Sequence, residues 1–277
     1  MVNVASVPHR SPFRYPGGKT WLVPRIRQWL RSQPKTPTLL VEPFAGGGTV
    51  ALTAACEGMA ERVLMVERDP DVASVWHTIL SADNSWLQNK ILGFALTAES
   101  VAHALEDPAT STRDRAFQTI LRNRVNHGGI LAPGSGRLKV GENGKGVASR
   151  WYPQTLASRI QTLATVSERI TFIEGDGLSV MDEYRDRLDA VFFIDPPYTA
   201  EGKRAGARLY TFSELDHDDL FRRTSRLQGD FLMTYDNADS VKELALKYGL
   251  STLVIPMKNT HHARMSELLI GRDLRWA

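Results

Sequence analysis

Residues 38–48 read Thr38-Leu39-Leu40-Val41-Glu42-Pro43-Phe44-Ala45-Gly46-Gly47-Gly48, a short apolar run that ends in three glycines. An apolar run without polar alternation predicts a strand buried on both faces, as in a parallel sheet. The residues from Thr49 to about Glu57 favour a helix. A buried strand, a tight turn and a helix form the repeating unit of an α/β sheet.

The same unit recurs along the chain. Six further apolar runs are predicted as strands: Arg62–Glu67, Ile170–Glu174, Ala190–Ile194, Phe231–Thr234, Leu250–Ile255 and Glu267–Ile270. Helical patterns fall at Trp21–Arg31, from Pro70 to about Trp76, at Trp151–Ser167 and at Asp216–Leu227. Strands that alternate with helices predict an α/β fold with a doubly wound, mostly parallel sheet of seven strands.

One connection is far too long for this pattern. About 100 residues without a strand pattern separate the second and third strands, whereas ordinary α/β connections take a few residues. Residues 86–121 are helical in pattern, and residues 128–150 contain 7 glycines in 23 positions. We therefore predict that residues 1–84 and 156–277 form one domain. Residues 85–155 form an inserted, mostly helical domain with a basic loop.

Composition excludes several classes of protein. The 277 residues are 23% charged and 42% hydrophobic, which is typical of a globular protein that needs no crosslinks. The single cysteine, Cys56, excludes an internal disulfide and a multi-cysteine zinc site. No apolar run approaches the roughly 20 residues that cross a bilayer, and residues 1–7 lack the pattern of a signal peptide. We expect a soluble, cytoplasmic protein.

The net charge of +3 conceals two basic segments. Residues 1–40 contain seven Lys or Arg residues and no acid, and residues 113–150 contain eight against Asp114 and Glu142. These segments therefore carry +7 and +6, which leaves −10 for the remainder. Such segregation is typical of a surface that binds a polyanion, although solvated charged faces are the structural alternative.

The glycine run has the spacing of a cofactor loop. Gly46, Gly48 and Ala51 satisfy the pattern G-x-G-x-x-G/A, and Glu67 follows about 20 residues after the loop, where a carboxylate binds ribose hydroxyls. Helix N-terminal N–H groups and glycine backbone let a ligand approach closely. These residues predict an adenosine-containing cofactor. By themselves they fit NAD as well as S-adenosylmethionine, and a glycine turn used only for packing is the structural alternative.

Asp195-Pro196-Pro197-Tyr198 follows the strand predicted at 190–194, at the sheet edge where α/β proteins bind ligands. A carboxylate and a prolyl carbonyl accept the two hydrogens of a planar amino group, and an aromatic ring stacks on its face. Hydrogen bonds of this kind favour the pyramidal nitrogen that can attack an activated methyl group. A rigid turn with a helix-capping Asp195 is the structural alternative.

Gly18-Lys19-Thr20 imitates the end of a P-loop, but position 13, where the P-loop needs a glycine, is Phe13. No strand leads into this segment, so a nucleotide-hydrolysing function is excluded.

The order of three motifs resembles the Dam-like family of N6-adenine DNA methyltransferases. These motifs are Phe13–Lys19, Glu42–Gly48 and Asp195–Tyr198. Further parts of the family pattern are similar to Glu67-Arg68-Asp69, Gly175-Asp176, Tyr210-x-Phe212 and Arg264…Glu267. The resemblance implies a Rossmann-like methyltransferase that uses S-adenosylmethionine, flips adenine out of duplex DNA and methylates N6. It covers residues 11–80 and 160–272, and favours a bacterial or phage-encoded protein.

The resemblance also implies roles for single residues. Asp195, Pro196 and Tyr198 form the catalytic site, with Tyr198 stacked on the flipped base. Tyr15 and Lys19 lie near the methionine end of the cofactor, Phe44 and Gly46 form its floor, Glu67 binds ribose, and Asp176 accepts from the adenine amino group. Asp195 also touches the cofactor.

The inserted region is predicted to face DNA. Arg and Asn side chains read guanine and adenine edges, which makes Arg122, Asn123, Arg124 and Asn126 candidates for base contacts. Arg137, Lys139 and Lys145 are predicted to bind phosphates. A solvated flexible loop is the structural alternative.

Other reactions and sites fit the sequence less well. Methylation of cytosine C5 needs a cysteine nucleophile, and Cys56 lies in an alanine-rich helix. His261-His262 has no third ligand at helical spacing, so no metal site is expected. The alternatives that stay open are a cytosine-N4 or RNA methyltransferase, an NAD-dependent Rossmann oxidoreductase and an inert DNA-binding module. We expect a monomer, with a cognate restriction nuclease as a further partner.

Overall fold

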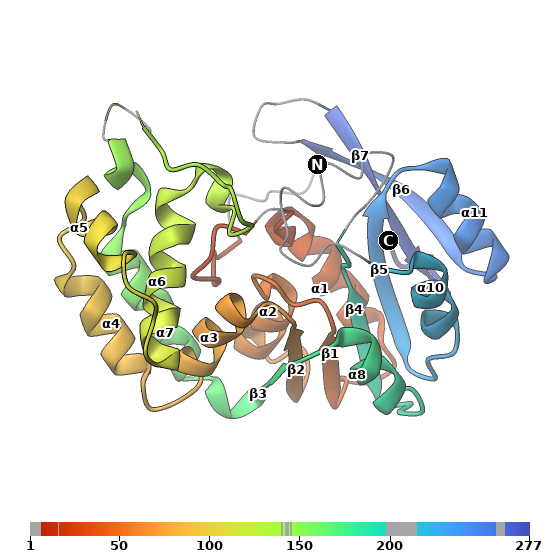
Figure 1. Ribbon diagram of the computed structural model, residues 1–277. Helices are drawn as coiled ribbons and strands as arrows, with labels where there is room; N and C mark the ends of the chain where they lie inside the picture. The colour runs from red at the N-terminus through yellow and green to blue at the C-terminus, as the bar shows by residue number, and fades with distance from the viewer. Residues whose placement is uncertain are drawn as a thin grey trace.

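The computed structural model contains a seven-stranded sheet with helices on both faces (Figure 1). It describes residues 7–15, 17–139, 141, 144, 146–197, 215–258 and 264–277. The strands are β1 (Leu39–Glu42), β2 (Arg62–Glu67), β3 (Ile170–Glu174), β4 (Ala190–Ile194), β5 (Asp230–Asp236), β6 (Ser251–Lys258) and β7 (Arg264–Gly271). Their order in the sheet is β3-β2-β1-β4-β5-β7-β6.

Strands β1 to β5 are mutually parallel, and β7 is antiparallel to both β5 and β6. The strand order reverses between β1 and β4, which places a crevice at the carboxyl ends of these two strands. The predicted fold class, a doubly wound and mostly parallel seven-stranded α/β sheet, is confirmed.

Alternate residues of the strands pack on opposite faces of the sheet. Leu40 of β1 and Phe193 of β4 belong to the core under α1 (Val23–Ser32), α2 (Thr49–Glu57) and α3 (Pro70–Ile79). Val41 and Phe192 belong to the core under α8 (Gly177–Glu183), α10 (His217–Ser225) and α11 (Asp239–Lys247). Because both faces are covered at the centre of the sheet, β4 is apolar throughout and shows no alternation in the sequence.

The segment between β2 and β3 forms a helical layer beside the sheet (Figure 1). Its helices are α4 (Asn84–Gly93), α5 (Ala98–Ala104), α6 (Thr112–Val125) and α7 (Pro153–Ala164), with short 3₁₀ turns at η3 (His127–Gly129) and η5 (Gly146–Arg150). Leu87 of α4, Ile120 of α6 and Ile160 of α7 belong to the same apolar core as Trp76 of α3. The inserted segment and the sheet domain therefore share a core, and a separate inserted domain remains a prediction.

Several predicted boundaries agree with the structure. The predicted limits of β2, β3, β4 and α2 are those observed. Helix α1 begins later than predicted because Lys19–Leu22 forms the 3₁₀ turn η2 in front of it. No helix in the described parts of the chain is long and apolar enough to cross a membrane.

Candidate active site

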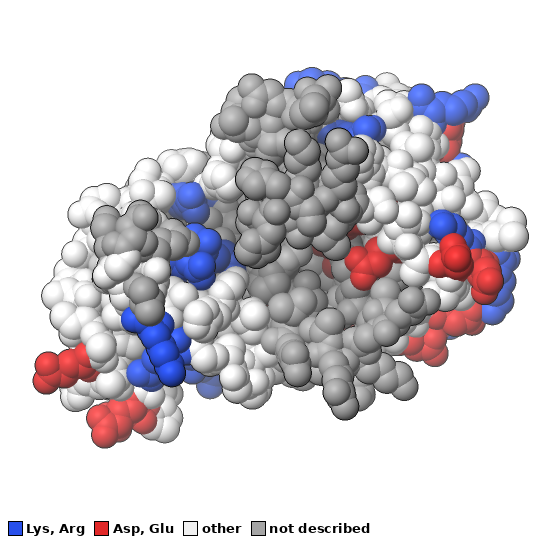
Figure 2. All heavy atoms as spheres, turned by 90° about the horizontal axis from the view of Figure 1, so that it is seen from above, with Lys and Arg blue, Asp and Glu red and all other residues white. Residues whose placement is uncertain are grey.

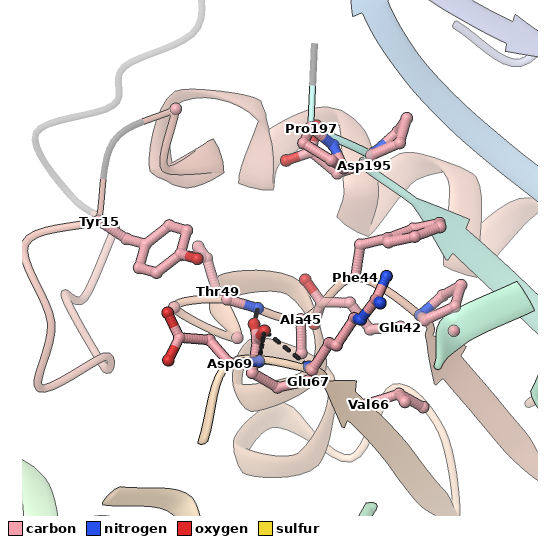
Figure 3. Close-up of a pocket in the computed structure, with 18 of the residues that line it drawn as sticks. Tyr15, Glu42, Phe44, Ala45, Thr49, Val66, Glu67, Asp69, Asp195 and Pro197 are labelled. Atoms are coloured by element: carbon pink, nitrogen blue, oxygen red, sulfur yellow. Dashed lines mark hydrogen bonds between the residues drawn. The ribbon is translucent and has the colours of Figure 1, made fainter. Parts of the chain in front are cut away.

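A pocket lies at the carboxyl edge of the sheet, where the ends of β1, β2, β3 and β4 meet. In the view of Figure 3, Tyr15 and Phe44 stand on opposite sides, Glu67 lies at the floor, and Asp195 is above. Every residue assigned by the resemblance to the cofactor lines this pocket: Tyr15, Lys19, Phe44, Gly46, Glu67, Asp176 and Asp195. The pocket thus brings together side chains that are up to 180 positions apart in sequence.

The glycine loop fits tightly against its surroundings. Gly46 has φ +48°, and a Cβ on it would lie 2.5 Å from Cε1 of Tyr15. Gly48 has φ +63°, and a Cβ there would lie 2.5 Å from Cε of Met65. The indole Nε1 of Trp76 donates to the carbonyl of Gly46 at 3.0 Å. Both glycines are required by backbone conformation and by close packing.

Glu67 ties the end of β2 to this loop. Its Oε2 accepts from the N–H of Gly46 at 2.9 Å, and its Oε1 accepts from the N–H groups of Arg68 and Asp69 at 2.7 and 2.8 Å. Burial raises the pKa of Glu67 to about 7, although these three N–H donors oppose the shift. The carboxylate has about four acceptor sites, so one remains for a ligand hydroxyl.

Asp176 lies at the end of β3 and caps helix α8. Its Oδ2 accepts from the N–H and the hydroxyl of Ser179 at 3.1 and 2.9 Å. The next residue, Gly177, approaches the β1 loop so closely that a Cβ would lie 2.1 Å from the carbonyl of Pro43. This contact fixes Asp176 beside the glycine loop, although the side chain itself is exposed.

Asp195, at the tip of β4, is held by two neighbouring side chains. Its Oδ1 lies 2.9 Å from Nζ of Lys19 and accepts from the hydroxyl of Thr234 at 2.8 Å. Lys19 also lies 3.2 Å from Oε1 of Glu267 on β7, and its side chain is only 5% exposed. Burial alone lowers the pKa of Lys19, but Asp195 and Glu267 together raise it to about 12. Lys19 is therefore a permanent cation between two carboxylates.

Buried carboxyl groups surround this ion pair. Glu42 is 3% exposed, and its Oε2 accepts from the N–H of Ala51 at 2.7 Å. Burial raises its pKa to about 8, and the charge of Asp195 contributes to the shift. Burial also raises the pKa of Asp236 at the end of β5. Glu42 is therefore mostly protonated at neutral pH, which limits the repulsion among these acids.

Sequence reasoning missed the supporting residues of this site. Glu42 lines the pocket, and Glu267 and Thr234 fix Lys19 and Asp195, but none was assigned a role. The signal was available for two of them, because Glu42 and Glu267 are charged residues within apolar strand sequences. A carboxylate in such a run is buried and must have a partner.

Of the other predicted catalytic residues, the structure describes Pro196, which follows Asp195 at the tip of β4. Pro196 lines the pocket and is buried, and Pro197 lines it beside Asp195 (Figure 3). Tyr198 lies outside the described residues, as do the segment from Tyr210 to Phe212 and the His261-His262 pair. Their predicted roles stay predictions.

Three of the residues predicted to read bases are buried and bind backbone instead. Asn123 accepts from the N–H of Arg14 at 2.9 Å and donates to the carbonyls of Arg14 and Gly129 at 3.1 and 2.7 Å. Asn126 donates to the carbonyl of Ile130 at 2.9 Å, and Arg124 donates to the carbonyl of Pro12. Side chains engaged in this way hold segments of the fold together, and the predicted contacts of these three residues with bases stay predictions.

The remaining candidates are closer to the surface. Arg122 is half-buried and forms an ion pair with Asp71 at 3.0 Å. Arg137 and Lys139 are exposed, on a segment that pairs with the end of α6 through the bridge between Asn126 and Arg137. Lys145 lies outside the described residues. Figure 2 shows several Lys and Arg side chains on the half of the upper face that carries α6 and the segment after it, and others on the opposite half, some of them beside acidic side chains.

The described residues include no group of three or more His, Cys, Asp or Glu side chains arranged to hold a metal ion.

One protein family matches part of the sequence. The model of the D12 class N6 adenine-specific DNA methyltransferases matches residues 15–84, which include Tyr15, Lys19, the glycine loop and Glu67. The resemblance to N6-adenine DNA methyltransferases is thereby confirmed over these residues. The match supports methyl transfer as the reaction of this pocket. No curated protein matches the chain.

Several solved structures have a similar chain path. A protein from Pyrococcus horikoshii assigned as an RNA methyltransferase is 9% identical, with a TM-score of 0.42 over 97% of this chain and 93% of that chain. A methyltransferase from Geobacter sulfurreducens is 14% identical, with a TM-score of 0.39 over 91% and 79%. A precorrin-6y C5,15-methyltransferase from Geobacter metallireducens is 10% identical, with a TM-score of 0.39 over 90% and 86%. Likeness at this level carries no information about substrate.

Proposed function

We propose that this chain is a DNA methyltransferase that transfers a methyl group from S-adenosylmethionine to the exocyclic N6 of adenine in duplex DNA. One observation carries the proposal: the glycine loop after β1 and Asp195 at the tip of β4 line the same pocket. The carboxylate that would accept from an amino group therefore lies beside the loop that would hold the cofactor.

The residues of the pocket fit an adenosine-containing group. Glu67 and Asp176 present carboxylates at the ends of neighbouring strands, and the ribose hydroxyls and the adenine amino group are hydrogen-bond donors. Glycine at position 46 lets the backbone pass directly under Tyr15. Tyr15, Lys19 and Phe44 complete the cofactor site. When bound, S-adenosylmethionine supplies an activated methyl group.

Asp195 orients the target amino group. An adenine amino nitrogen is a poor nucleophile because its lone pair is delocalised into the ring. Asp195 and the carbonyl of Pro196 accept its two hydrogens, and this favours the pyramidal nitrogen. Lys19 and Thr234 fix the carboxylate that accepts. The reaction then depends on positioning more than on a strong base.

Adenine inside a duplex cannot reach a pocket at the edge of a sheet. The enzyme flips the nucleotide out, at a cost of roughly a few kcal/mol, and Tyr198 stacks on the base. Residues 85–155 form the DNA-facing part of the protein, with Arg137, Lys139 and Lys145 on phosphates. A monomeric state and a cognate restriction nuclease remain predictions of the resemblance.

The direct test is product analysis. The chain is incubated with duplex DNA and with RNA in the presence of S-adenosylmethionine that carries a labelled methyl group, and the nucleosides are separated. Label in N6-methyladenine from DNA is expected. Label only in N4-methylcytosine or only in RNA would replace the proposal by one of its alternatives.

Calorimetric titration with S-adenosylhomocysteine and with NAD separates the reaction classes. We expect heat with S-adenosylhomocysteine. Heat with NAD alone would identify an oxidoreductase and would overturn the proposal.

A further inference from the structure

Residues 8–14 lie against α6 and α7, and two arginines hold them there. Arg159 of α7 donates through Nη1 to the carbonyl of Ser11 at 2.9 Å, and Arg124 of α6 donates to the carbonyl of Pro12. Ser11 and Pro12 are consecutive, so the two guanidinium groups lie close together. Arg14 follows two positions later, and Asn123 binds both its N–H and its carbonyl.

Arg124 and Arg159 are neutralised by no acid that the structure describes. Carbonyl oxygens accept from Arg124 and Arg159, and neither arginine forms an ion pair within the described residues. By contrast, Arg10 and Arg27 share the carboxylate of Glu57 at 2.8 and 2.7 Å. The contact between residues 8–14 and helices α6 and α7 therefore holds two arginines that pair with no described acid.

Arg124 is in the most unfavourable position. It is 4% exposed, and its buried Nε has no hydrogen-bond partner. Burial, together with the charges of Arg159 and Arg14, lowers its pKa to about 9. Burial and Arg159 also lower the pKa of His9. A buried arginine is ordinarily paired with an acid, and a buried charge without such a partner is strongly destabilising, so an anion bound nearby would relieve it.

We propose that Arg14, Arg124 and Arg159 form a binding site for a backbone phosphate of the substrate DNA. Arg14 is exposed and Arg159 is half-buried, so both reach solvent. Arg124 is buried and contributes its positive charge without reaching solvent. A phosphodiester offers two charged oxygens, and guanidinium groups bind these with charge-assisted hydrogen bonds. This inference rests on the proposed DNA substrate and specifies which part of it is bound here.

The position of the site gives it a role in the reaction. Arg14 directly precedes Tyr15, whose ring covers Gly46 in the pocket. Adjacent Cα atoms are about 3.8 Å apart, so the phosphate lies close to the mouth of the pocket. It belongs to the nucleotides next to the target adenine. Holding the backbone there fixes the strand from which the base rotates.

The test measures DNA affinity as a function of salt for Arg159→Gln, Arg159→Lys and Arg14→Gln. Arg31→Gln is the matched control, because Arg31 is exposed at the end of α1 and loses the same charge. For Arg159→Gln and Arg14→Gln we expect affinity about tenfold lower at low salt, on every DNA sequence. The slope of log affinity against log salt should fall by about 0.9, the value for one phosphate on B-DNA. Arg159→Lys should recover most of both quantities.

The thermal midpoint of the free protein is measured in rising inorganic phosphate as a second readout. Wild type and Arg31→Gln should be stabilised by phosphate more than Arg159→Gln is, because the anion relieves the charge around Arg124. If Arg159→Gln matches Arg31→Gln in affinity, salt slope and phosphate response, the site does not exist, whatever the protein does to DNA. If the wild type binds S-adenosylhomocysteine but no DNA, the proposed substrate is wrong and this inference falls with it.

Discussion

Lys19 and Asp195 lie 2.9 Å apart, although one precedes the first strand and the other ends the fourth. The pair joins the motif around Lys19 to the proposed catalytic carboxylate, and Glu267 shares the same ammonium group. A single buried cation therefore orients the group that is proposed to receive the substrate.

Replacement of Asp195 by alanine tests that group directly. Asp195→Ala should abolish methyl transfer, measured with labelled S-adenosylmethionine, and leave DNA affinity within a few fold. The exposed Asp186 provides the control, since Asp186→Asn removes a carboxylate far from the pocket lining and should keep full activity. Lost DNA affinity with intact chemistry would contradict the role assigned to Asp195.

Removal of the cation should destabilise the fold. Lys19→Met removes the cation that Asp195 and Glu267 share, and the free energy of unfolding should fall by about 3–5 kcal/mol at pH 7 in urea titrations. The pKa of Lys19 is raised to about 12, so its contribution is complete below the unfolded value near 10.4 and disappears as the pH rises through 12. A difference between wild type and variant that stays constant up to pH 12 would show that the ion pair is not the cause.

Glu67 should make cofactor affinity depend on pH. Its pKa is raised to about 7, and only the ionised carboxylate keeps an acceptor site for a ribose hydroxyl beside its three backbone donors. The affinity for S-adenosylhomocysteine should therefore increase from pH 6 to pH 8 in calorimetric titrations. Glu67→Gln should bind more weakly and without this increase. A variant as pH-dependent as the wild type would assign the titration to another group.

Glu42 should lower stability as the pH rises. Its pKa is raised from 4.5 to about 8, so the folded state binds more protons than the unfolded state between these values, and the free energy of unfolding declines over this range. Glu42→Gln replaces the acid by a neutral group that still accepts from Ala51. The free energy of unfolding of this variant, relative to that of wild type, should rise by on the order of a few kcal/mol between pH 5 and pH 8. A constant difference over this range would contradict the raised pKa.

Gly46 should not tolerate a side chain. Gly46→Ala brings a Cβ to 2.5 Å from the ring of Tyr15 at φ +48°, which should reduce the affinity for S-adenosylhomocysteine at least tenfold. Gly93→Ala is the control, because a Cβ there meets no atom within 4 Å. The double variant Gly46→Ala, Tyr15→Ala lacks the ring that the new Cβ meets. It should therefore be more stable than the single variant Gly46→Ala. Normal binding by Gly46→Ala would mean that the loop does not approach the ligand.

Much of the sheet could be predicted because its strands are covered on both faces. Arg62–Glu67 and Ala190–Ile194 are continuous apolar runs bounded by polar residues, and their limits were predicted correctly. Strands β6 and β7 extend beyond their predicted limits, because they pair with each other and continue past the core, where the sequence loses its apolar pattern. Helices α8 and α11, of 7 and 9 residues, were not predicted.

The site was predictable where chemistry is local and not where it depends on distant contacts. The glycine loop and the residues after β4 are contiguous motifs, and the structure brings them to one pocket. The backbone contacts of Asn123 and Arg124 could not be predicted, because their partners, Arg14 and Pro12, are more than a hundred positions away. The amino-acid types alone do not distinguish an arginine that reads a base from one that anchors another segment.

The arrangement of β7 between β5 and β6 also constrains how the protein is made. Glu267 leaves the ribosome after every other strand of the sheet, and a nascent chain halted before it cannot supply the second carboxylate to Lys19. The charged centre is therefore completed only after translation has passed this strand, and until then Lys19 has Asp195 but lacks its second carboxylate.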